Sequence, residues 1–304
     1  MKNGIIYEFW GRSKLLNLGN KRYSDYVKNF FEDKLKDDMI NKDITTKILI
    51  KNNSARASIV AKEDGILSGM EECSILFKGL KVKNKKKDGE KIKKGQVITE
   101  LSGNINKFLG VERTILNVLQ RMSGIATIIY NLNKKIKNNC KIAATRKTLW
   151  GLLDKKAVST GKGLTHRLNL SDGILIKDNH IKALNNDIKT ALILADNNKK
   201  TKFVEIEVAN KRQALKAALT ISSLKNKKSK KIFAIMLDNM SPKEIKKTID
   251  EIKSKKLQNN VLFEASGNIN EKNIAKYSKT GIDIISLGFI THSAKALDIA
   301  LEIK

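Results

Sequence analysis

The sequence predicts an α/β protein: an open (β/α) barrel, TIM-like but incomplete, preceded by an N-terminal α+β sandwich domain. Three observations lead to this prediction. From residue 142 onward, short apolar runs rich in β-branched residues recur about every 30 residues, with helical periodicity between them. Polar residues follow the carboxyl ends of these runs. Before residue 110, the apolar runs are instead separated by glycine turns.

The first part of the chain mixes helix and strand patterns. An amphipathic pattern predicts a helix over 23–40, and three apolar runs at 55–61, 65–69 and 95–101 predict strands of a mainly antiparallel sheet. A long apolar face from 112 to 137 predicts a helix that joins the two parts of the chain. Together these elements predict a separate α+β domain with a mainly antiparallel sheet.

The later apolar runs are short and do not alternate with polar residues, as expected for parallel strands covered on both faces. The segment from Ser241 to Glu244 predicts a helix start between two of them, with Ser as the N-cap and Pro at the first helical position. Strand–helix units of this length form parallel sheets, and polar residues at successive strand ends favour a barrel over a flat sheet. Six strands are visible, so the barrel is either open or completed by a seventh strand that the pattern does not reveal. The runs begin near Ile142, Ile174, Phe203, Ile232, Val261 and Ile282.

These patterns divide the chain into three ranges. We predict an N-terminal sandwich domain over 1–115 and an open α/β barrel carrying the active site over 116–290. A C-terminal helix is expected over 291–304, with packing back on the N-terminal domain as one option.

The chain is strongly basic, with 60 Lys and Arg against 31 Asp and Glu in 304 residues and a formal net charge of +29. Such a charge is compatible with a nucleic-acid-binding surface. However, the lysines are scattered over the whole chain, and aromatic residues do not interleave with them as a stacking platform would require. We therefore expect compositional bias and no nucleic-acid partner.

Cysteine usage and hydropathy bear on the compartment. The two cysteines, Cys73 and Cys140, are far apart and show no metal-binding spacing, so we expect reduced, buried thiols in a cytoplasmic protein. No stretch approaches the ~20 apolar residues of a membrane span, and the N-terminus has too short an apolar run for a signal peptide. We expect no membrane partner.

Charged clusters at the ends of the apolar runs are the main functional signal. The predicted strand ends carry cations first, at Arg146-Lys147, His166-Arg167 and Lys177, and carboxylates later, at Glu207 and Asp238. A single Arg or Lys after a strand is usually a solvated loop residue. A converging set of cations suits a small, multiply anionic molecule, and carboxylates beside it suit a sugar or a metal. The pattern suggests phosphoribosyl chemistry.

Several motifs around these residues resemble quinolinate phosphoribosyltransferases. The resemblance runs in order from about residue 35 to 293, and a series of this length is far more specific than any one motif. The matching segments are Asp43-Ile44-Thr45-Thr46, the stretch from Glu112 to Thr127, Thr145-Arg146-Lys147-Thr148, His166-Arg167, the stretch from Leu175 to His180, Val204-Glu205-Ile206-Glu207-Val208, Met236-Leu237-Asp238-Asn239, Ala265-Ser266-Gly267 and Thr291-His292-Ser293.

The resemblance implies a pentosyltransferase of de novo NAD biosynthesis. Its substrates are quinolinate and phosphoribosyl pyrophosphate, its products are nicotinate mononucleotide, pyrophosphate and CO2, and its cofactor is Mg2+. It also implies an N-terminal α/β sandwich, an open barrel, and a homodimer or a hexamer built as a trimer of dimers.

Residue roles follow from the same resemblance. Arg146, His166, Arg167 and Lys177 line the quinolinate pocket, and Arg113 is contributed by the N-terminal domain of the neighbouring subunit. Lys147 contacts a phosphate or the pyrophosphate. Glu207 and Asp238 lie near the ribose hydroxyls, Mg2+ and the developing oxocarbenium cation. Ser266, Gly267 and Gly288 form the cradle of the 5′-phosphate. Lys147, Lys177, Glu207 and Asp238 are the expected catalytic residues.

The sequence also departs from the family pattern. Gly161-Lys162-Gly163 stands where a glycine triplet is usual, Leu149-Trp150-Gly151 replaces Thr-Pro-Gly, and Asn268 replaces a second glycine after Gly267. If position 268 requires positive φ, Asn tolerates it better than most residues. The first ~20 residues exceed the usual start and could form an extra arm or strand.

Three alternatives remain open at this point. The first is a related pyrophosphorylase of the molybdenum-transport-associated type that acts on another anionic base. The others are a basic nucleic-acid-binding protein on a barrel scaffold and a catalytically idle scaffold. The intact segment from Lys177 to His180 favours the quinolinate enzyme.

Overall fold

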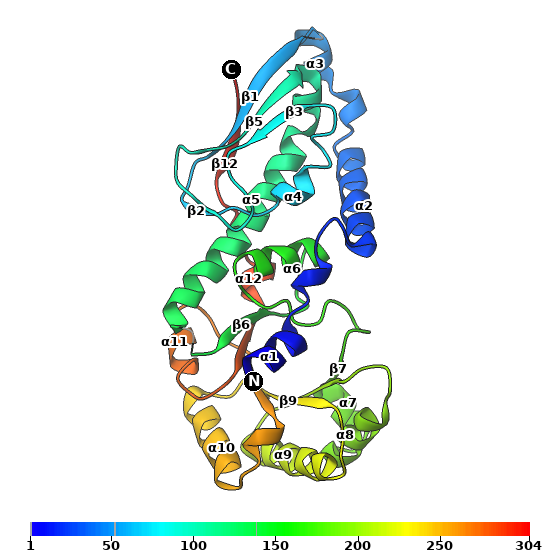
Figure 1. Ribbon diagram of the computed structural model, residues 1–304, viewed down its shortest axis with the longest axis vertical. Helices are drawn as coiled ribbons and strands as arrows, with labels where there is room; N and C mark the ends of the chain where they lie inside the picture. The colour runs from blue at the N-terminus through cyan, green and yellow to red at the C-terminus, as the bar shows by residue number, and fades with distance from the viewer. Residues whose placement is uncertain (1, 52, 138) are drawn as a thin grey trace. The chain divides into compact units, whose positions relative to one another are not determined.

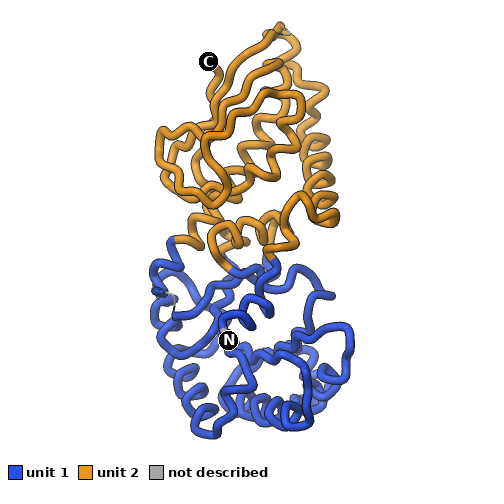
Figure 2. The backbone as a smooth tube through the Cα atoms, in the orientation of Figure 1, with its two compact units in different colours: residues 1–12, 131–147, 164–289 blue, residues 13–130, 148–163, 290–304 orange. Residues whose placement is uncertain are grey.

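The structure is a computed structural model that describes residues 2–51, 53–137 and 139–304. The chain forms two compact units, each assembled from three segments (Figure 2). Unit 1 comprises residues 1–12, 131–147 and 164–289, and unit 2 comprises residues 13–130, 148–163 and 290–304. The predicted ranges 1–115 and 116–290 were continuous, whereas the chain enters each unit three times.

Unit 1 is built on a parallel sheet of six strands, as the spacing of the apolar runs predicts (Figure 1). Its spatial order is β6-β11-β10-β9-β8-β7, so β6 and β7 are the two edges. The strands are β6 (Lys141–Ala144), β7 (Ile174–Ile176), β8 (Phe203–Val208), β9 (Ile232–Asp238), β10 (Leu262–Ser266) and β11 (Ile284–Leu287).

The sheet curves into an incomplete barrel. Side chains from β6, β8, β9, β10 and β11 share one core cluster with residues of α1. The two edges do not pair with each other. A short segment lies beside β6 instead: Leu164 forms an isolated parallel bridge with Ala143, which is the nearest approach to a seventh strand in the described residues.

Helices connect the strands of unit 1. The clearest start is that of α10 (Pro242–Ser254), where Ser241 Oγ accepts from the Glu244 N–H and the Glu244 carboxylate accepts from the Ser241 N–H. This capping box is the one that the sequence predicts. The other helices are α7 (Asp178–Ala183), α8 (Ile188–Asn197), α9 (Lys211–Asn226), the 3-10 turn η3 (Gln258–Asn260) and α11 (Ile274–Tyr277).

A further helix, α1 (Lys2–Trp10), belongs to unit 1 and was not predicted; an arm or strand was the expectation for the first ~20 residues. Its side chains Ile6, Phe9 and Trp10 are buried against residues at the amino-terminal half of the sheet, including Ala234 and Leu262. The helix therefore fills the barrel interior from the end opposite the strand carboxyl ends. Short helical segments of this kind depend on tertiary packing more than on propensity.

Unit 2 contains a four-stranded antiparallel sheet of order β12-β1-β5-β3 and a two-stranded sheet of β2 and β4. The predicted antiparallel sheet is therefore present. Its strands are β1 (Ser54–Ala61), β2 (Gly65–Ile66), β3 (Lys81–Asn84), β4 (Lys91–Ile92), β5 (Val97–Asn104) and β12 (Ile299–Ile303).

The helices of unit 2 include α2 (Lys21–Asp37), which confirms the amphipathic pattern over 23–40 within a few residues. The long helix α5 (Ile105–Ile136) begins seven residues earlier than the predicted start at 112. The remaining helical segments are η1 (Ser13–Leu15), η2 (Ile40–Lys42), α3 (Ile44–Leu49), α4 (Met70–Cys73), α6 (Gly151–Thr160) and α12 (Phe289–His292). In the described part of the chain, no helix combines the length and apolarity needed to cross a bilayer.

The C-terminal helix expected over 291–304 was wrong. Helix α12 ends at His292, and the last residues form β12, which pairs antiparallel with β1 from Ala57↔Ile303 to Ala61↔Ile299. The segment is apolar in most positions, so its pattern suited a short helix as well as a strand. The open edge of β1 decides the outcome, because only pairing satisfies its backbone groups.

Candidate active site at the carboxyl ends of the parallel strands

Side chains on the inner face of the sheet form layers, because alternate residues of a strand point to the same face. The layer nearest α1 is apolar and includes Phe203, Ala234 and Leu262. Two residues further along two of these strands lie Glu205 and Glu264, and two further lie Glu207, Asp238 and Ser266. Three predicted site residues, Glu207, Asp238 and Ser266, therefore lie at the carboxyl ends of neighbouring strands. We call this end of the sheet the rim.

The acidic half of this rim is paired with a cation. The Nζ of Lys177 lies 3.0 Å from Oε2 of Glu207, and the neighbouring strands β7 and β8 hold their backbones in parallel register. The pKa of Asp238 is raised by burial and then by the negative charge of Glu207. The Nδ2 of Asn239 donates to Oδ2 of Asp238 at 2.5 Å. The negative charges of Glu207 and Asp238 repel each other, so a cationic ligand beside them is favoured.

Lys177 is held in place by the helix that follows it. The Nδ1 of His180 accepts the backbone N–H of Lys177 at 2.9 Å, which satisfies a donor at the start of α7. His180 therefore supports the backbone at Lys177.

The cationic half of the rim lies near the edge strand β6. Arg146 and Lys147 follow β6 directly and are exposed. Arg167 is half-buried, and its pKa is lowered by burial and then by the charge of Arg146. The two guanidinium groups are therefore close enough to repel each other. A bound carboxylate would relieve this repulsion and accept two-pronged hydrogen bonds.

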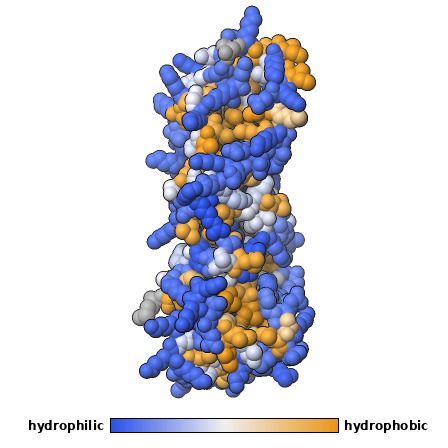
Figure 3. Space-filling model, turned by 90° about the vertical axis from the view of Figure 1, so that its right-hand side faces the viewer, coloured by the Kyte–Doolittle hydropathy of each residue, from blue (hydrophilic) through white to orange (hydrophobic). Residues whose placement is uncertain are grey.

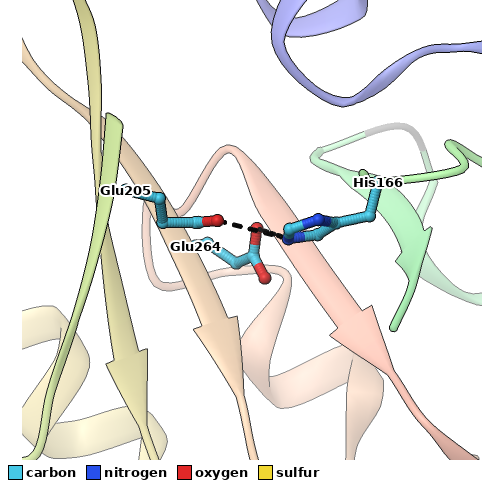
Figure 4. Close-up of side chains that lie close together, drawn as sticks. All are labelled: His166, Glu205 and Glu264. Carbon is cyan, nitrogen blue, oxygen red and sulfur yellow. Dashed lines mark ion pairs between the residues drawn. The ribbon is translucent and has the colours of Figure 1, made fainter. Parts of the chain in front are cut away.

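His166 extends into the polar layer beneath this rim and meets the two buried glutamates (Figure 4). Its Nε2 lies 3.2 Å from Oε2 of Glu205 and 3.5 Å from Oε2 of Glu264. All three residues are buried, with exposed fractions of 6%, 1% and 0%. The backbone of His166 has φ 55°, a left-handed conformation in which histidine is found more often than most residues.

The other ring nitrogen of His166 is also engaged. Its Nδ1 accepts the backbone N–H of Arg167 at 2.8 Å, so the ring proton lies on Nε2 and points to the carboxylates. Burial by itself lowers the pKa of His166, but the charges of Glu264 and Glu205 outweigh burial and raise it. A second proton on Nδ1 would nevertheless displace the Arg167 N–H, so the geometry favours the singly protonated ring.

The loop that carries His166 and Arg167 is anchored by the segment after α1. The backbone N–H of Arg12 donates to Oγ1 of Thr165 at 2.9 Å, and its Nε donates to Oδ1 of Asp172 at 2.8 Å. The other oxygen of Asp172 accepts the backbone N–H of Leu168 at 2.9 Å. Both ends of the loop are therefore fixed to one arginine, a contact that motif spacing could not indicate.

Gly267 and Asn268 follow β10, where the sequence predicts a phosphate cradle. Gly267 has φ +88°, and a Cβ there would lie 2.2 Å from Oδ1 of Asn239, so no other residue fits without movement. Asn268 has φ 53°, which confirms that this position requires the left-handed region. Its Nδ2 donates to Oδ1 of Asn239 at 3.0 Å. Ser266 is the last residue of β10, and Gly288 follows β11 at the same rim.

Arg113 differs from the other predicted residues because it belongs to unit 2. It is exposed on α5 and lines a cavity together with Phe30, Lys34 and Trp150. The ten other predicted residues all lie in unit 1. Glu205 belongs to one of the family motifs without an assigned role, and Glu264 belongs to none of them. An acidic residue in the middle of an apolar strand is nevertheless a signal of function, because buried carboxylates are rare unless they are paired.

Glu207 and Asp238 suit a magnesium ion. Both offer carboxylate oxygens at the ends of adjacent strands, and their mutual repulsion favours a cation between or beside them. Mg2+ is usually held by one or two carboxylates, with waters and substrate phosphates as the remaining ligands. The donor set of this rim therefore fits the expected metal.

Comparisons with known proteins agree with this geometry. The family model described as the quinolinate phosphoribosyl transferase N-terminal domain matches residues 43–123, and that of the C-terminal domain matches residues 125–302. A protein of Methanothermobacter thermautotrophicus named as a probable nicotinate-nucleotide pyrophosphorylase (carboxylating) is 38% identical over 270 residues, covering 86% of this chain and 93% of its own. A chloroplastic nicotinate-nucleotide pyrophosphorylase (carboxylating) of Arabidopsis thaliana is 36% identical, with 81% and 73% covered.

Solved structures are similar over nearly the whole chain. The nicotinate-nucleotide pyrophosphorylase of Francisella tularensis matches with a TM-score of 0.80 at 32% identity, covering 92% of this chain and 96% of its own. That of Ehrlichia chaffeensis matches with a TM-score of 0.80 at 34% identity, covering 91% and 98%.

Proposed function

The chain belongs to the quinolinate phosphoribosyltransferase family, and on that premise we propose how its strand-end site carries out the family's reaction. The enzyme transfers phosphoribosyl from phosphoribosyl pyrophosphate to quinolinate and forms nicotinate mononucleotide, pyrophosphate and CO2 in NAD biosynthesis. The observation that carries the assignment of roles is the division of one rim into a cationic half and an acidic half.

Quinolinate occupies the cationic half in this proposal. Its two adjacent carboxylates would be costly to bury without partners. Arg146 and Arg167 repel each other in the free enzyme. In the complex, each forms an ion pair with one carboxylate of quinolinate, or both contact the two carboxylates together. Lys177 supplies a third cation from the opposite edge of the sheet. His166 lines the base of the pocket.

The ribose occupies the acidic half. Departure of pyrophosphate leaves positive charge on the anomeric carbon and ring oxygen, and fixed negative charge nearby lowers the free energy of that transition state. Glu207 and Asp238 hold carboxylates at this rim before substrate binds. We assign them the ribose hydroxyls and the developing cation.

The phosphate groups take the remaining positions. Ser266, Gly267 and Gly288 offer backbone N–H groups that can approach a 5′-phosphate closely because little side chain intervenes. Lys147, exposed after β6, is assigned to the pyrophosphate. Mg2+ at Glu207 and Asp238 would neutralise the leaving pyrophosphate when bound. The protein otherwise orients the reactants. When CO2 departs, the positive charge of the new pyridinium nitrogen stabilises the electron pair left on the adjacent ring carbon, and that carbon then takes up a proton from water.

Two further properties belong to the proposal. The first is a homodimer, alone or within a hexamer, in which Arg113 reaches the site of the partner subunit. The exposed apolar residues of α3 support an association surface, since Ile44, Ile48 and Leu49 are each at least 70% exposed. An apolar cluster is visible at the α3 end of unit 2 (Figure 3). The second is a reducing cytoplasmic compartment, supported by two free, buried cysteines.

A substrate comparison tests the assignment. Purified enzyme with phosphoribosyl pyrophosphate and Mg2+ is supplied in turn with quinolinate, nicotinate and pyridine-2,4-dicarboxylate. We expect nicotinate mononucleotide and CO2 from quinolinate only, because the other acids lack the adjacent pair of carboxylates. Turnover of nicotinate at a comparable rate would contradict the proposed pocket.

A further inference from the structure

Two glutamates lie inside the barrel where packing alone would place apolar side chains. The layer below them is apolar, and Glu205 and Glu264 are almost completely buried. Burying a carboxylate costs several kcal/mol unless it is paired. Among the described residues, His166 is the cationic or proton-donating group within ion-pair distance of both. The two buried carboxylates therefore depend on His166 as a partner, and the buried His166 ring depends on them in the same way.

The glutamates lie on central strands of the sheet, whereas the histidine lies in a loop. Glu205 pairs with Leu175 and Ala234 of the flanking strands, and Glu264 pairs with Met236 and Ile284. Both backbones are thus fixed by ladders on two sides. His166 lies in the loop between α6 and β7, with a left-handed backbone that few non-glycine residues adopt. The orientation of its ring must come from the groups that its nitrogens meet.

The two ring nitrogens connect the glutamates to a substrate-binding residue. Nε2 faces Glu205 and Glu264, and Nδ1 accepts the backbone N–H of Arg167. Arg167 has one further hydrogen bond in the loop, from Nη1 to the Gly173 carbonyl at 3.2 Å. The imidazole of His166 therefore links the two glutamates of the sheet to the backbone of Arg167.

We propose that Glu205 and Glu264 are positioning residues for quinolinate binding, which act through the His166 ring to set the backbone, and thereby the guanidinium, of Arg167. The inference rests on the proposed function, because quinolinate is the anion that Arg167 grips. Neither glutamate touches substrate. Removing the charge of one leaves the fold intact but lets the ring turn, so Arg167 loses its alignment with Arg146.

The test compares isosteric variants by steady-state kinetics. Glu264→Gln keeps the shape but removes a negative charge that lies 3.5 Å from Nε2. Loss of a charged partner corresponds to about 10–100-fold in binding. We expect the KM for quinolinate to rise about tenfold or more, with the KM for phosphoribosyl pyrophosphate and the midpoint of urea unfolding little changed. Glu264→Asp, which keeps the charge with a shorter reach, should recover part of the loss.

A matched control and a double variant make the test specific. Asp283 is also a buried carboxylate of this sheet and accepts the Phe263 N–H at 2.9 Å, but it lies at the amino-terminal ends of the strands. Asp283→Asn should lower stability and leave the KM for quinolinate unchanged. In a His166→Ala background, Glu264→Gln should have no further effect on the KM for quinolinate, because the ring through which Glu264 acts on Arg167 is already absent.

Three outcomes would overturn the inference. An unchanged KM for quinolinate in Glu264→Gln would remove the positioning role, while turnover by the parent enzyme would still uphold the proposed function. Additive effects of Glu264→Gln and His166→Ala would show that the glutamate does not act through the ring. One equivalent of a transition metal in the purified enzyme, lost in Glu264→Gln, would make the cluster a metal centre instead.

Discussion

Lys177 lies at the boundary between the two halves of the proposed site. It neutralises Glu207 in the free enzyme, yet it is assigned to a carboxylate of quinolinate in the complex. Because its side chain is about half exposed, at 48%, the ion pair itself contributes little to stability. Its position lets quinolinate binding and the charge of the acidic half influence each other.

Replacing Lys177 should therefore affect binding and catalysis but not folding. For Lys177→Ala we expect kcat/KM for quinolinate to fall about 10–100-fold, the value of a lost charge-assisted hydrogen bond. Lys182→Ala is the matched control, because Lys182 is an exposed lysine that pairs with Asp178 on the same helix, at 3.2 Å. Equal kinetics of the two variants would contradict the role of Lys177. Circular dichroism and urea unfolding check that both fold.

A buried carboxyl in unit 2 should make stability depend on pH. Burial raises the pKa of Glu72 to about 7, although the Tyr23 hydroxyl that donates to it at 2.7 Å opposes the shift. The folded state therefore binds a proton that the unfolded state releases near pH 4.5. The stabilisation is full below that pH and is lost as pH rises through 7, by at most roughly 3 kcal/mol.

The variant Glu72→Gln tests this pH dependence. Glutamine keeps an acceptor for the Tyr23 hydroxyl without a titrating group, so we expect its free energy of unfolding to change less between pH 5 and pH 8 than that of the parent protein. Urea unfolding at both pH values provides the measurement. An equally steep decline in the variant would show that another group is responsible.

Individual residues differ in how far the sequence predicts them. Strand-end residues such as Asp238 could be placed because an apolar run marks the strand and parallel strands end at one rim. The left-handed backbone at Asn268 followed from the replaced glycine. The partnership of His166 with Glu205 and Glu264 could not be predicted, because it depends on the curvature of the sheet and on a loop conformation.

At the scale of elements, the six parallel strands were predictable because each is a continuous apolar run with a helical segment after it. The strand β12 and the helix α1 were not, and the reason is the same for both. Each is short, and its conformation is decided by the surface that it meets: the edge of β1 in one case and the barrel interior in the other. Local pattern contains no information on that surface.

The burial of α1 leads to a prediction about stability. Trp10 is fully buried in the core shared with Ala234 and Leu262, whereas Tyr7 on the same helix is 51% exposed. Trp10→Ala should lower the free energy of unfolding by about 3–5 kcal/mol, the usual cost of removing a large buried aromatic side chain. Tyr7→Ala is the control and should change it by less than about 1 kcal/mol. Similar losses in both variants, measured by urea unfolding, would mean that α1 is not packed as described.

At the scale of the whole molecule, the main open proposal is that the site is completed by a second chain. Arg113 lies in unit 2, lines a cavity there and is exposed, while the other substrate-binding residues lie in unit 1. If Arg113 serves the partner's barrel, then a protomer lacking Arg113 and one lacking Lys177 each have strongly reduced activity alone but can complement each other.

Complementation between the two impaired variants tests this arrangement, with activity measured well below the KM for quinolinate. Arg113→Ala and Lys177→Ala chains are co-expressed with different affinity tags, and the mixed dimers are isolated. One of the two sites in each mixed dimer then carries both intact residues, so about half of the parental activity should return, or about a quarter in an unsorted statistical mixture. Failure of pure mixed dimers to regain activity would show that Arg113 acts within its own chain or not at all.

The two edge strands of the described sheet, β6 and β7, share no ladder with each other. A closed ring of strands can change its circumference only by breaking backbone hydrogen bonds. Among the described residues, Leu164 pairs with β6 but not with β7. Arg146 follows one of these edge strands, and Lys177 follows the other. The distance between these two cations is therefore not fixed by a strand ladder, so they can separate for an entering dianion and approach each other around it.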